Sequence, residues 1–163
     1  MVLGNGVTLR VIHTPGHASN HLCYLLEEER LLFTGDHLMQ GSTVVINPPD
    51  GNMVAYLASL KGLLDEELEW LAPGHGFLID EPHAVIRKMI AHRLAREAKV
   101  LAAVQAHGPV DAAGLLSVVY ADTPTLLHAV ALRSLHAHLI KLQADCAVEP
   151  DERGLWRLVA AVQ

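Results

Sequence analysis

Three short motifs in this sequence each place a histidine or an aspartate beside a glycine, directly after an apolar stretch. They are HTPGH at residues 13–17, TGDH at 34–37 and PGHG at 73–76. Glycine lets the backbone turn sharply, so a side chain at a strand end can point into a cleft. We therefore expect a fold in which several strand ends meet around a binding or catalytic site.

The segments around the first two motifs have the pattern of short β-strands. Residues 7–14 form one candidate strand, while 21–26 and 31–34 flank a charged turn and predict a hairpin. A hairpin returns to the end where it began, so His17 and Asp36 should lie close together. His75 joins them if the apolar segment 68–72 enters the same sheet with the right polarity. Residues 43–46 are a further candidate strand.

Helical spacing predicts a helix over 53–64 and a long helix over 82–106, which Gly108-Pro109 ends. In the remaining tail, Asp111 is a candidate cap for a helix that runs to Tyr120. Thr123 or Thr125 is the candidate cap of a second helix. Two short strands, 146–148 and 155–162, then surround a polar turn and resemble a wing. The sequence thus predicts a domain over 1–105 that includes the linking helix, and a small domain over 106–163.

The chemistry of the three motifs favours a metal site. Two imidazoles and a carboxylate, from His17, His75 and Asp36, suit a borderline cation such as zinc. A carboxylate can also bridge two metal ions about 3.5–4 Å apart, and such a pair makes a hydroxide nucleophile at neutral pH. Each motif alone is more often an ordinary surface turn. Three of them in this order, each after a strand, favour the metal interpretation.

Other residues near the motifs are weaker candidates. His13, His21 and His37 adjoin the motifs, where they either orient metal ligands or are ordinary strand and turn residues. Ser42 is a candidate substrate contact in the loop after Asp36, together with Thr43, Asn47 and Asn52.

Composition excludes several classes of protein. Half of the chain is apolar (51%), so it can build a core, and the net charge of −6 gives no general attraction to nucleic acid. Two distant cysteines form no disulfide framework, which favours the cytoplasm. We expect no signal peptide and no membrane span, because no apolar run approaches about 18 residues.

The order and gaps of HTPGH, GD and PGHG resemble the last three metal motifs of the metallo-β-lactamase superfamily. Residues 7–105 resemble its glyoxalase II-like branch, including TGDHLMQGSTVVINPPDGNMVAYLASL. Residues 106–163 resemble the winged helix of the β-lactamase-like protein 2 group, in VVYADTP and LRSLHAHLIKLQADCAVEP.

The resemblance implies an α/β (α+β) chain, half of a four-layer αββα sandwich followed by a small winged helix. His17 would bind a first metal ion, Asp36 would bridge two ions as the catalytic carboxylate, and His75 would bind the second. The ions would be zinc, with iron or manganese as alternatives. A metal-bound hydroxide would attack a thioester, an ester or a phosphodiester, in a small molecule or in RNA.

One departure from the family pattern changes these expectations. The first metal motif, HxHxDH, is absent from the sequence. Three ligands then serve two metal ions, so we expect the chain alone to bind metal weakly and to hydrolyse poorly. Half of a sandwich also leaves an apolar sheet face uncovered, which predicts a homo-oligomer or a missing N-terminal half.

Two functions compete with the hydrolase. One is a nucleic-acid-binding winged helix, but residues 106–163 carry four basic and six acidic residues, a net of −2, which argues against duplex DNA. The other is a non-catalytic interaction module, which the missing motif would explain.

Overall fold

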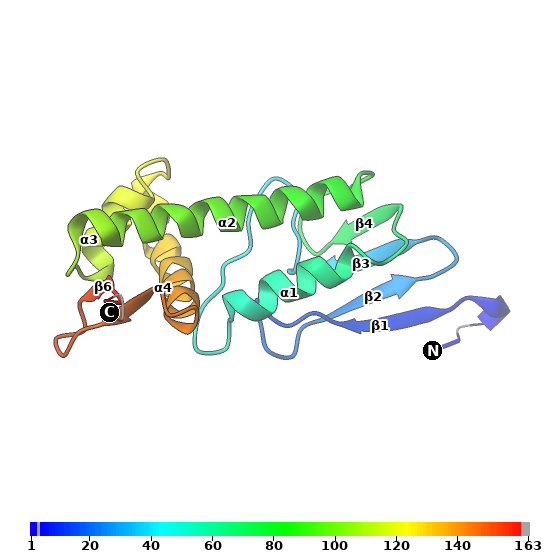
Figure 1. Ribbon diagram of the computed structural model, residues 1–163. Coiled ribbons are helices and arrows are strands. Elements are labelled where there is room, and N and C mark those ends of the chain that lie inside the picture. Colours follow the sequence, from blue (N-terminus) through cyan, green and yellow to red (C-terminus); the bar gives the residue numbers. More distant parts are fainter. Residues whose placement is uncertain (3, 161–163) are drawn as a thin grey trace. The chain divides into compact units, whose positions relative to one another are not determined.

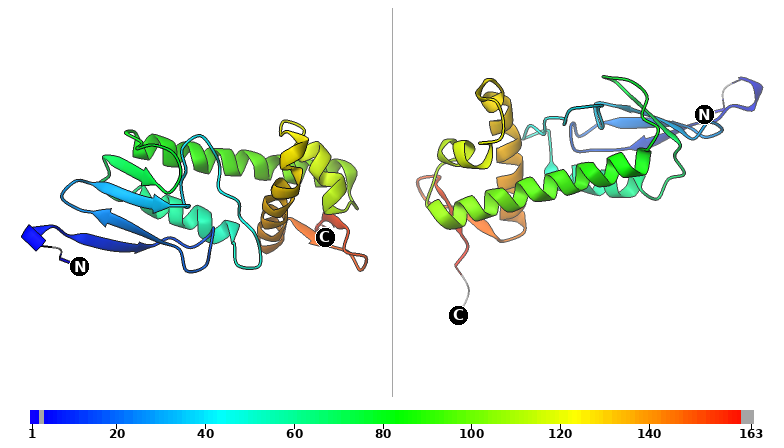
Figure 2. Two further views of the ribbon diagram at one scale, coloured as in Figure 1. Left: turned by 180° about the vertical axis from the view of Figure 1, so that it is seen from behind. Right: turned by 90° about the horizontal axis from the view of Figure 1, so that it is seen from above.

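The computed structural model describes residues 1–2 and 4–160, which form two compact units (Figures 1 and 2). The first unit is Met1–Ala91 and the second is His92–Gln163. The division falls inside the long helix α2 (Pro82–His107), whereas the sequence analysis assigns this helix as far as residue 105 to the first domain. Each unit has its own sheet, which gives a mixed α+β fold.

A four-stranded sheet forms the first unit, in the order β1-β2-β3-β4 (Figure 1). Its strands are β1 (Leu9–His13), β2 (Leu22–Leu26), β3 (Leu31–Gly35) and β4 (Trp70–Pro73). The predicted hairpin is confirmed, because β2 pairs antiparallel with both β1 and β3. In contrast, β4 pairs parallel with β3, so these two strands end at the same edge.

Helices cover one face of this sheet (Figure 2). Helix α1 (Met53–Leu63) begins where the sequence predicts, since the Asn52 side chain accepts a hydrogen bond from the Ala55 amide (3.0 Å). Its residues Tyr56 and Leu60 are fully buried, as are Cys23, Leu32 and Leu71 on the covered face of the sheet. This apolar layer holds the strands in place.

Residues 43–46 form no strand, so that prediction is wrong. Val44 and Ile46 are buried while Thr43 is exposed. This alternation imitates the period of a strand, but here it reflects a loop that buries every second side chain.

The turn that carries His17 is fastened to α1. The Asn52 amide donates to the Gly16 carbonyl (2.8 Å), and the Ser59 hydroxyl donates to the Pro15 carbonyl (2.8 Å). Gly16 has a φ of 143°, and a Cβ placed there would lie 2.4 Å from the Cα of Tyr56. Only glycine therefore allows the turn to approach the helix this closely.

The second unit contains α3 (Ala112–Val119), η2 (Thr125–Leu127), α4 (His128–Ala144) and a hairpin of β5 (Val148–Pro150) with β6 (Trp156–Leu158). The hairpin is the predicted wing. Its first strand lies two residues later than predicted and its second strand is shorter, and residues 161–162 of the expected second strand lie outside the described residues.

The predicted cap of α3 is confirmed, since Asp111 accepts from the Gly114 amide at 2.7 Å. The predicted cap of α4 is wrong. The chain enters α4 through the 3-10 turn η2, and Leu127 at the N-cap position makes no side-chain cap. A threonine cap is not needed, because the turn itself supplies backbone partners: the Leu127 amide donates to the Pro124 carbonyl.

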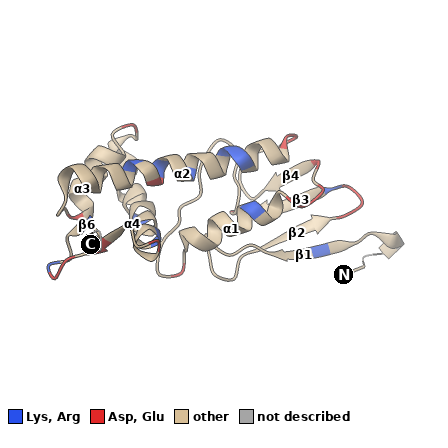
Figure 3. Ribbon diagram, in the orientation of Figure 1, with Lys and Arg blue, Asp and Glu red and all other residues tan. Residues whose placement is uncertain are grey.

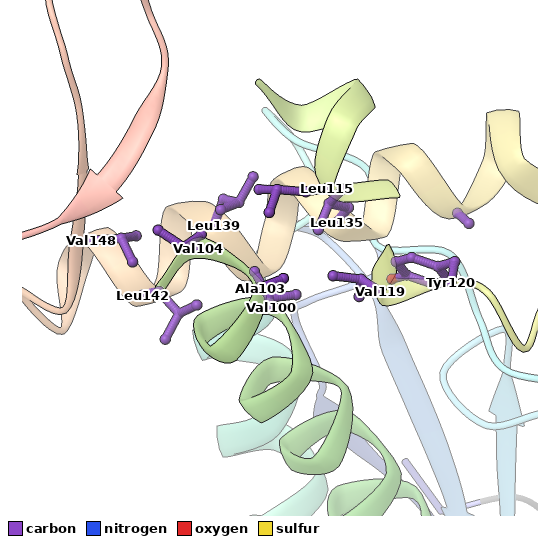
Figure 4. Close-up of a cluster of buried hydrophobic side chains, with 11 residues drawn as sticks. Val100, Ala103, Val104, Leu115, Val119, Tyr120, Leu135, Leu139, Leu142 and Val148 are labelled. Atoms are coloured by element: carbon purple, nitrogen blue, oxygen red, sulfur yellow. The ribbon is translucent and has the colours of Figure 1, made fainter. Parts of the chain in front are cut away.

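A separate aliphatic core stabilises the second unit (Figure 4). Leu115 of α3, Leu135 and Leu139 of α4 and Val100 of α2 are completely buried in it. Trp156 of the wing packs against this core and also pairs with Val110, which ties the hairpin to the start of α3. Three helices and a hairpin around one core are the parts of a winged helix.

The close approach at Gly16 gives a first prediction. Gly16→Ala should lower the free energy of unfolding by about 1–3 kcal/mol, because the new methyl group overlaps α1. Gly62→Ala is the matched control, since a Cβ at this helical glycine meets nothing within 4 Å. It should raise stability by up to about 1 kcal/mol. Urea unfolding of the two variants measures both changes in the free energy of unfolding. Equal changes would contradict the close packing of Gly16 against α1.

Candidate metal centre at one end of the sheet

The three glycine motifs meet at one end of the four-stranded sheet. HTPGH leaves β1 and leads into β2, and the other two motifs begin in the last residues of β3 and β4. The Gly74 amide donates to the Gly35 carbonyl (2.9 Å). This hydrogen bond joins the two loops at the residues that directly precede His75 and Asp36.

Asp36 and His75 form the most direct pair of this site. The Nε2 atom of His75 lies 3.5 Å from the Oδ1 atom of Asp36, and the two side chains are 74% and 44% exposed. Two donor atoms that bind one tetrahedral zinc ion at about 2.0–2.1 Å lie roughly 3.3 Å apart. The observed separation therefore suits two ligands of one ion, and both side chains are open to solvent.

His17 is oriented by the backbone of the loop after β3. Its Nδ1 atom donates to the Val45 carbonyl (2.8 Å), which leaves the lone pair of the neutral ring on Nε2. Histidines that bind metals are typically held in this way, with one ring nitrogen donating to a carbonyl and the other free to bind. This contact is compatible with the ligand role predicted for His17.

His21 and His37 form a row of rings beside His17. The ring centroids of His17 and His21 lie 6.5 Å apart, and those of His21 and His37 lie 5.5 Å apart. The Nδ1 atom of His21 is 2.8 Å from the Thr14 hydroxyl. The His37 ring is completely buried against Tyr56, and within the described residues its two nitrogens have no hydrogen-bond partner.

This row is held uncharged at neutral pH. Burial lowers the pKa of His37 to about 3, with smaller contributions from His21 and His17. Burial also lowers the pKa of His21; His17 adds to this effect and Asp36 opposes it. The rings of His21 and His37 therefore favour their neutral forms.

The remaining candidates are exposed or are used in other contacts. His13 is exposed, and its Nε2 atom donates to the Ser19 carbonyl (3.0 Å), which stabilises the turn after β1. Ser42 is exposed in the loop after Asp36. Asn52, a weaker substrate candidate, is instead occupied as the cap of α1.

The residues present suit a metal ion chemically, but they are too few to complete its coordination. Within residues 1–2 and 4–160, no three histidine, cysteine, aspartate or glutamate side chains gather closely enough to hold one ion. A catalytic zinc ion takes about three protein ligands plus water. The described residues thus bring Asp36 and His75 together without forming a complete set of metal ligands.

Two features of this site have no recognisable signal in the sequence. One is the Val45 carbonyl, a backbone group that any residue type supplies. The other is Gln40, which contacts the loop of His75 through its backbone and its side chain. An exposed glutamine in a loop is an ordinary surface residue by sequence pattern alone.

None of the helices in the described part of the chain is long and apolar enough to cross a membrane.

Comparison with known families assigns both units. Residues 2–75 match the metallo-beta-lactamase superfamily, and residues 112–156 match the beta-lactamase associated winged helix domain. The first match covers the first two glycine motifs and ends at His75 of the third, and the second begins at α3 and ends in the wing.

Individual relatives match over nearly the whole chain. The beta-lactamase-like protein 2 homolog of Caenorhabditis elegans is 34% identical over 146 residues, which cover 89% of this chain and 48% of that protein. The atrochrysone carboxyl ACP thioesterase of Aspergillus chevalieri is 32% identical over 158 residues, covering 91% of this chain and 50% of that protein. The chain thus spans about half the length of these relatives.

A solved structure agrees with this assignment. A metallo-beta-lactamase family protein of Thermus thermophilus superposes with a TM-score of 0.82 at 27% identity, over 94% of this chain and 50% of the other. The chain therefore carries part of a metallo-beta-lactamase superfamily domain, followed by a beta-lactamase-associated winged helix domain.

Proposed function

We propose that this chain is the C-terminal half of a metal-dependent hydrolase that acts on thioesters. The observation that carries the proposal is the pair of Asp36 and His75, placed 3.5 Å apart at the coincident ends of β3 and β4. Asp36, His75 and His17 would hold the metal, with zinc favoured by the mixed nitrogen and oxygen donors and iron or manganese as alternatives. The metal would supply a hydroxide nucleophile at neutral pH.

The chain's own residues orient this ligand set. The Val45 carbonyl fixes the ring of His17, and the Gly35 carbonyl fixes the start of the His75 loop. The remaining ligands would come from a segment that carries the HxHxDH motif, because this sequence lacks it. On its own the chain would bind metal weakly and hydrolyse slowly.

The thioester is the preferred substrate class because a relative that matches 91% of this chain is named as a thioesterase. The exposed end of the sheet, with Asp36 and His75 open to solvent, gives access to a bulky acyl group. Other esters and phosphodiesters, including RNA, are the alternatives, and the chimaera described below separates the thioester from the phosphodiester.

The uncovered face of the sheet supports the view that the chain is one half of a fold. Val11, Tyr24 and Phe33 are partners in register across β1, β2 and β3, and their exposed fractions are 50%, 39% and 43%. Trp70 on β4 is also 41% exposed. Because the relatives are about twice as long as this chain, we propose that a further segment covers this face.

The winged helix is proposed as a packing or interaction domain that does not read duplex DNA. Helix α4 carries two basic residues, Arg133 and Lys141 (Figure 3). The Lys141 ammonium is already paired with Glu97 (2.8 Å) and Asp145 (2.6 Å). Phosphate contacts dominate affinity for DNA, and this surface offers few cations for them.

A chimaera tests the substrate class. Joining the N-terminal half of the Caenorhabditis elegans relative to residues 1–163 should give an enzyme that releases thiol from an acyl thioester faster than it cleaves a phosphodiester. Asp36→Asn should lower thioester turnover more than about 100-fold. Substitution of residues that only hydrogen-bond to metal ligands already lowers activity by about 10–100-fold, and Asp36 is proposed as a ligand itself. Steady-state kinetics with added Zn²⁺ measure both rates.

His107→Ala is the control for the chimaera, since this residue lies at the end of α2 in the second unit. It should leave turnover unchanged. Hydrolysis that survives both Asp36→Asn and a chelator would contradict the proposed function, and faster cleavage of the phosphodiester would replace the thioester as substrate.

The uncovered sheet face gives a separate prediction for the isolated chain. We expect it to self-associate, and Phe33→Lys should weaken this association by about 10-fold or more, because a charge replaces the centre of the apolar row. Val118→Lys is the matched control, as Val118 is 49% exposed on α3. Sedimentation at increasing concentration measures the effect. A wild-type chain that stays monomeric throughout would show that this face needs no cover.

A further inference from the structure

Gln40 touches the loop of His75 at two points. Its backbone amide donates to the His75 carbonyl (3.4 Å), and its side-chain oxygen accepts from the Phe77 amide (2.9 Å). The first bond lies at His75 itself and the second lies two residues later. Gln40 therefore brackets the residue whose side chain faces Asp36.

The residue between these contacts is shaped to fit Gln40. Gly76 has a φ of 102°, and a Cβ built on it would lie 2.6 Å from the Cβ of Gln40. The backbone of the His75 loop thus passes against the side chain of Gln40 at a distance that only glycine permits.

The side chain of His75 is mostly exposed. Its exposed fraction is 74%, and its Nε2 atom lies 3.5 Å from Asp36. On the N-terminal side, the Gly74 amide is bonded to Gly35. Gln40 supplies the corresponding restraint on the C-terminal side, so both ends of the loop are joined to the segment that carries Asp36.

We propose that Gln40 is a positioning residue that holds the His75 imidazole at ligand distance from Asp36. The inference rests on the proposed function, since it concerns the same pair of residues. A metal ion gains affinity when its ligands are fixed before binding, because the cost of ordering them is already met by the fold. Gln40 provides this order without touching the ion.

Three variants of the full chain separate this role from general stability. Gln40→Leu removes the acceptor for the Phe77 amide at similar volume, and Gln40→Glu keeps an acceptor oxygen. Gln105→Leu repeats the first change on α2 in the second unit, where Gln105 is exposed. Thermal unfolding should be similar in all three.

Two measurements then read the role directly. In Gln40→Leu, hydrogen exchange of the Phe77 amide should become faster, and the dissociation constant for Co²⁺ should rise by about 10-fold or more. Gln40→Glu should keep slow exchange and bind Co²⁺ at least as tightly as the wild type. Gln105→Leu should match the wild type in both measurements.

Two results would overturn the positioning role while leaving the proposed function intact. One is unchanged Phe77 exchange in Gln40→Leu, and the other is faster exchange with an unchanged Co²⁺ affinity. If the wild-type chain shows no Co²⁺ binding that His75→Ala removes, the proposed metal site fails, and the role of Gln40 fails with it.

Discussion

The parallel pairing of β3 with β4 is the constraint on which the candidate site depends. It puts the carboxyl ends of two strands at one edge, so that Asp36 and His75 follow the same end of the sheet. Helix α1 forms part of the crossover that parallel strands require, and it also receives the turn that holds His17. Together with the antiparallel pairing of β1, β2 and β3, this parallel pairing brings the three motifs to one end of the sheet.

Local patterns were enough to predict the elements whose signals are short in range. The hairpin of β2 and β3, helix α1, the long helix α2 and the Asp111 cap all agree with the sequence analysis. The prediction of a strand failed at 43–46, because a loop there buries alternate side chains as a strand would. The prediction of a side-chain cap failed before α4, because a backbone turn takes its place.

The site was predictable only in part, for physical reasons. Glycine motifs mark Asp36 and His75, but their meeting depends on the direction of β4, which its four residues do not encode. The roles of Val45 and Gln40 come from backbone geometry and loop contacts that arise only in the folded chain. The shortage of ligands, in contrast, was predictable because the sequence lacks the HxHxDH motif. It is consistent with the chain matching only 48% of the Caenorhabditis elegans relative.

The central claim is that this chain supplies only part of a metal site. The most direct test is the zinc content per chain after dialysis, measured by plasma mass spectrometry. We expect well below one retained equivalent, because the described residues offer no group of three ligands for one ion. About two retained equivalents that disappear in His75→Ala would contradict the claim, since the site would then be complete without a further segment.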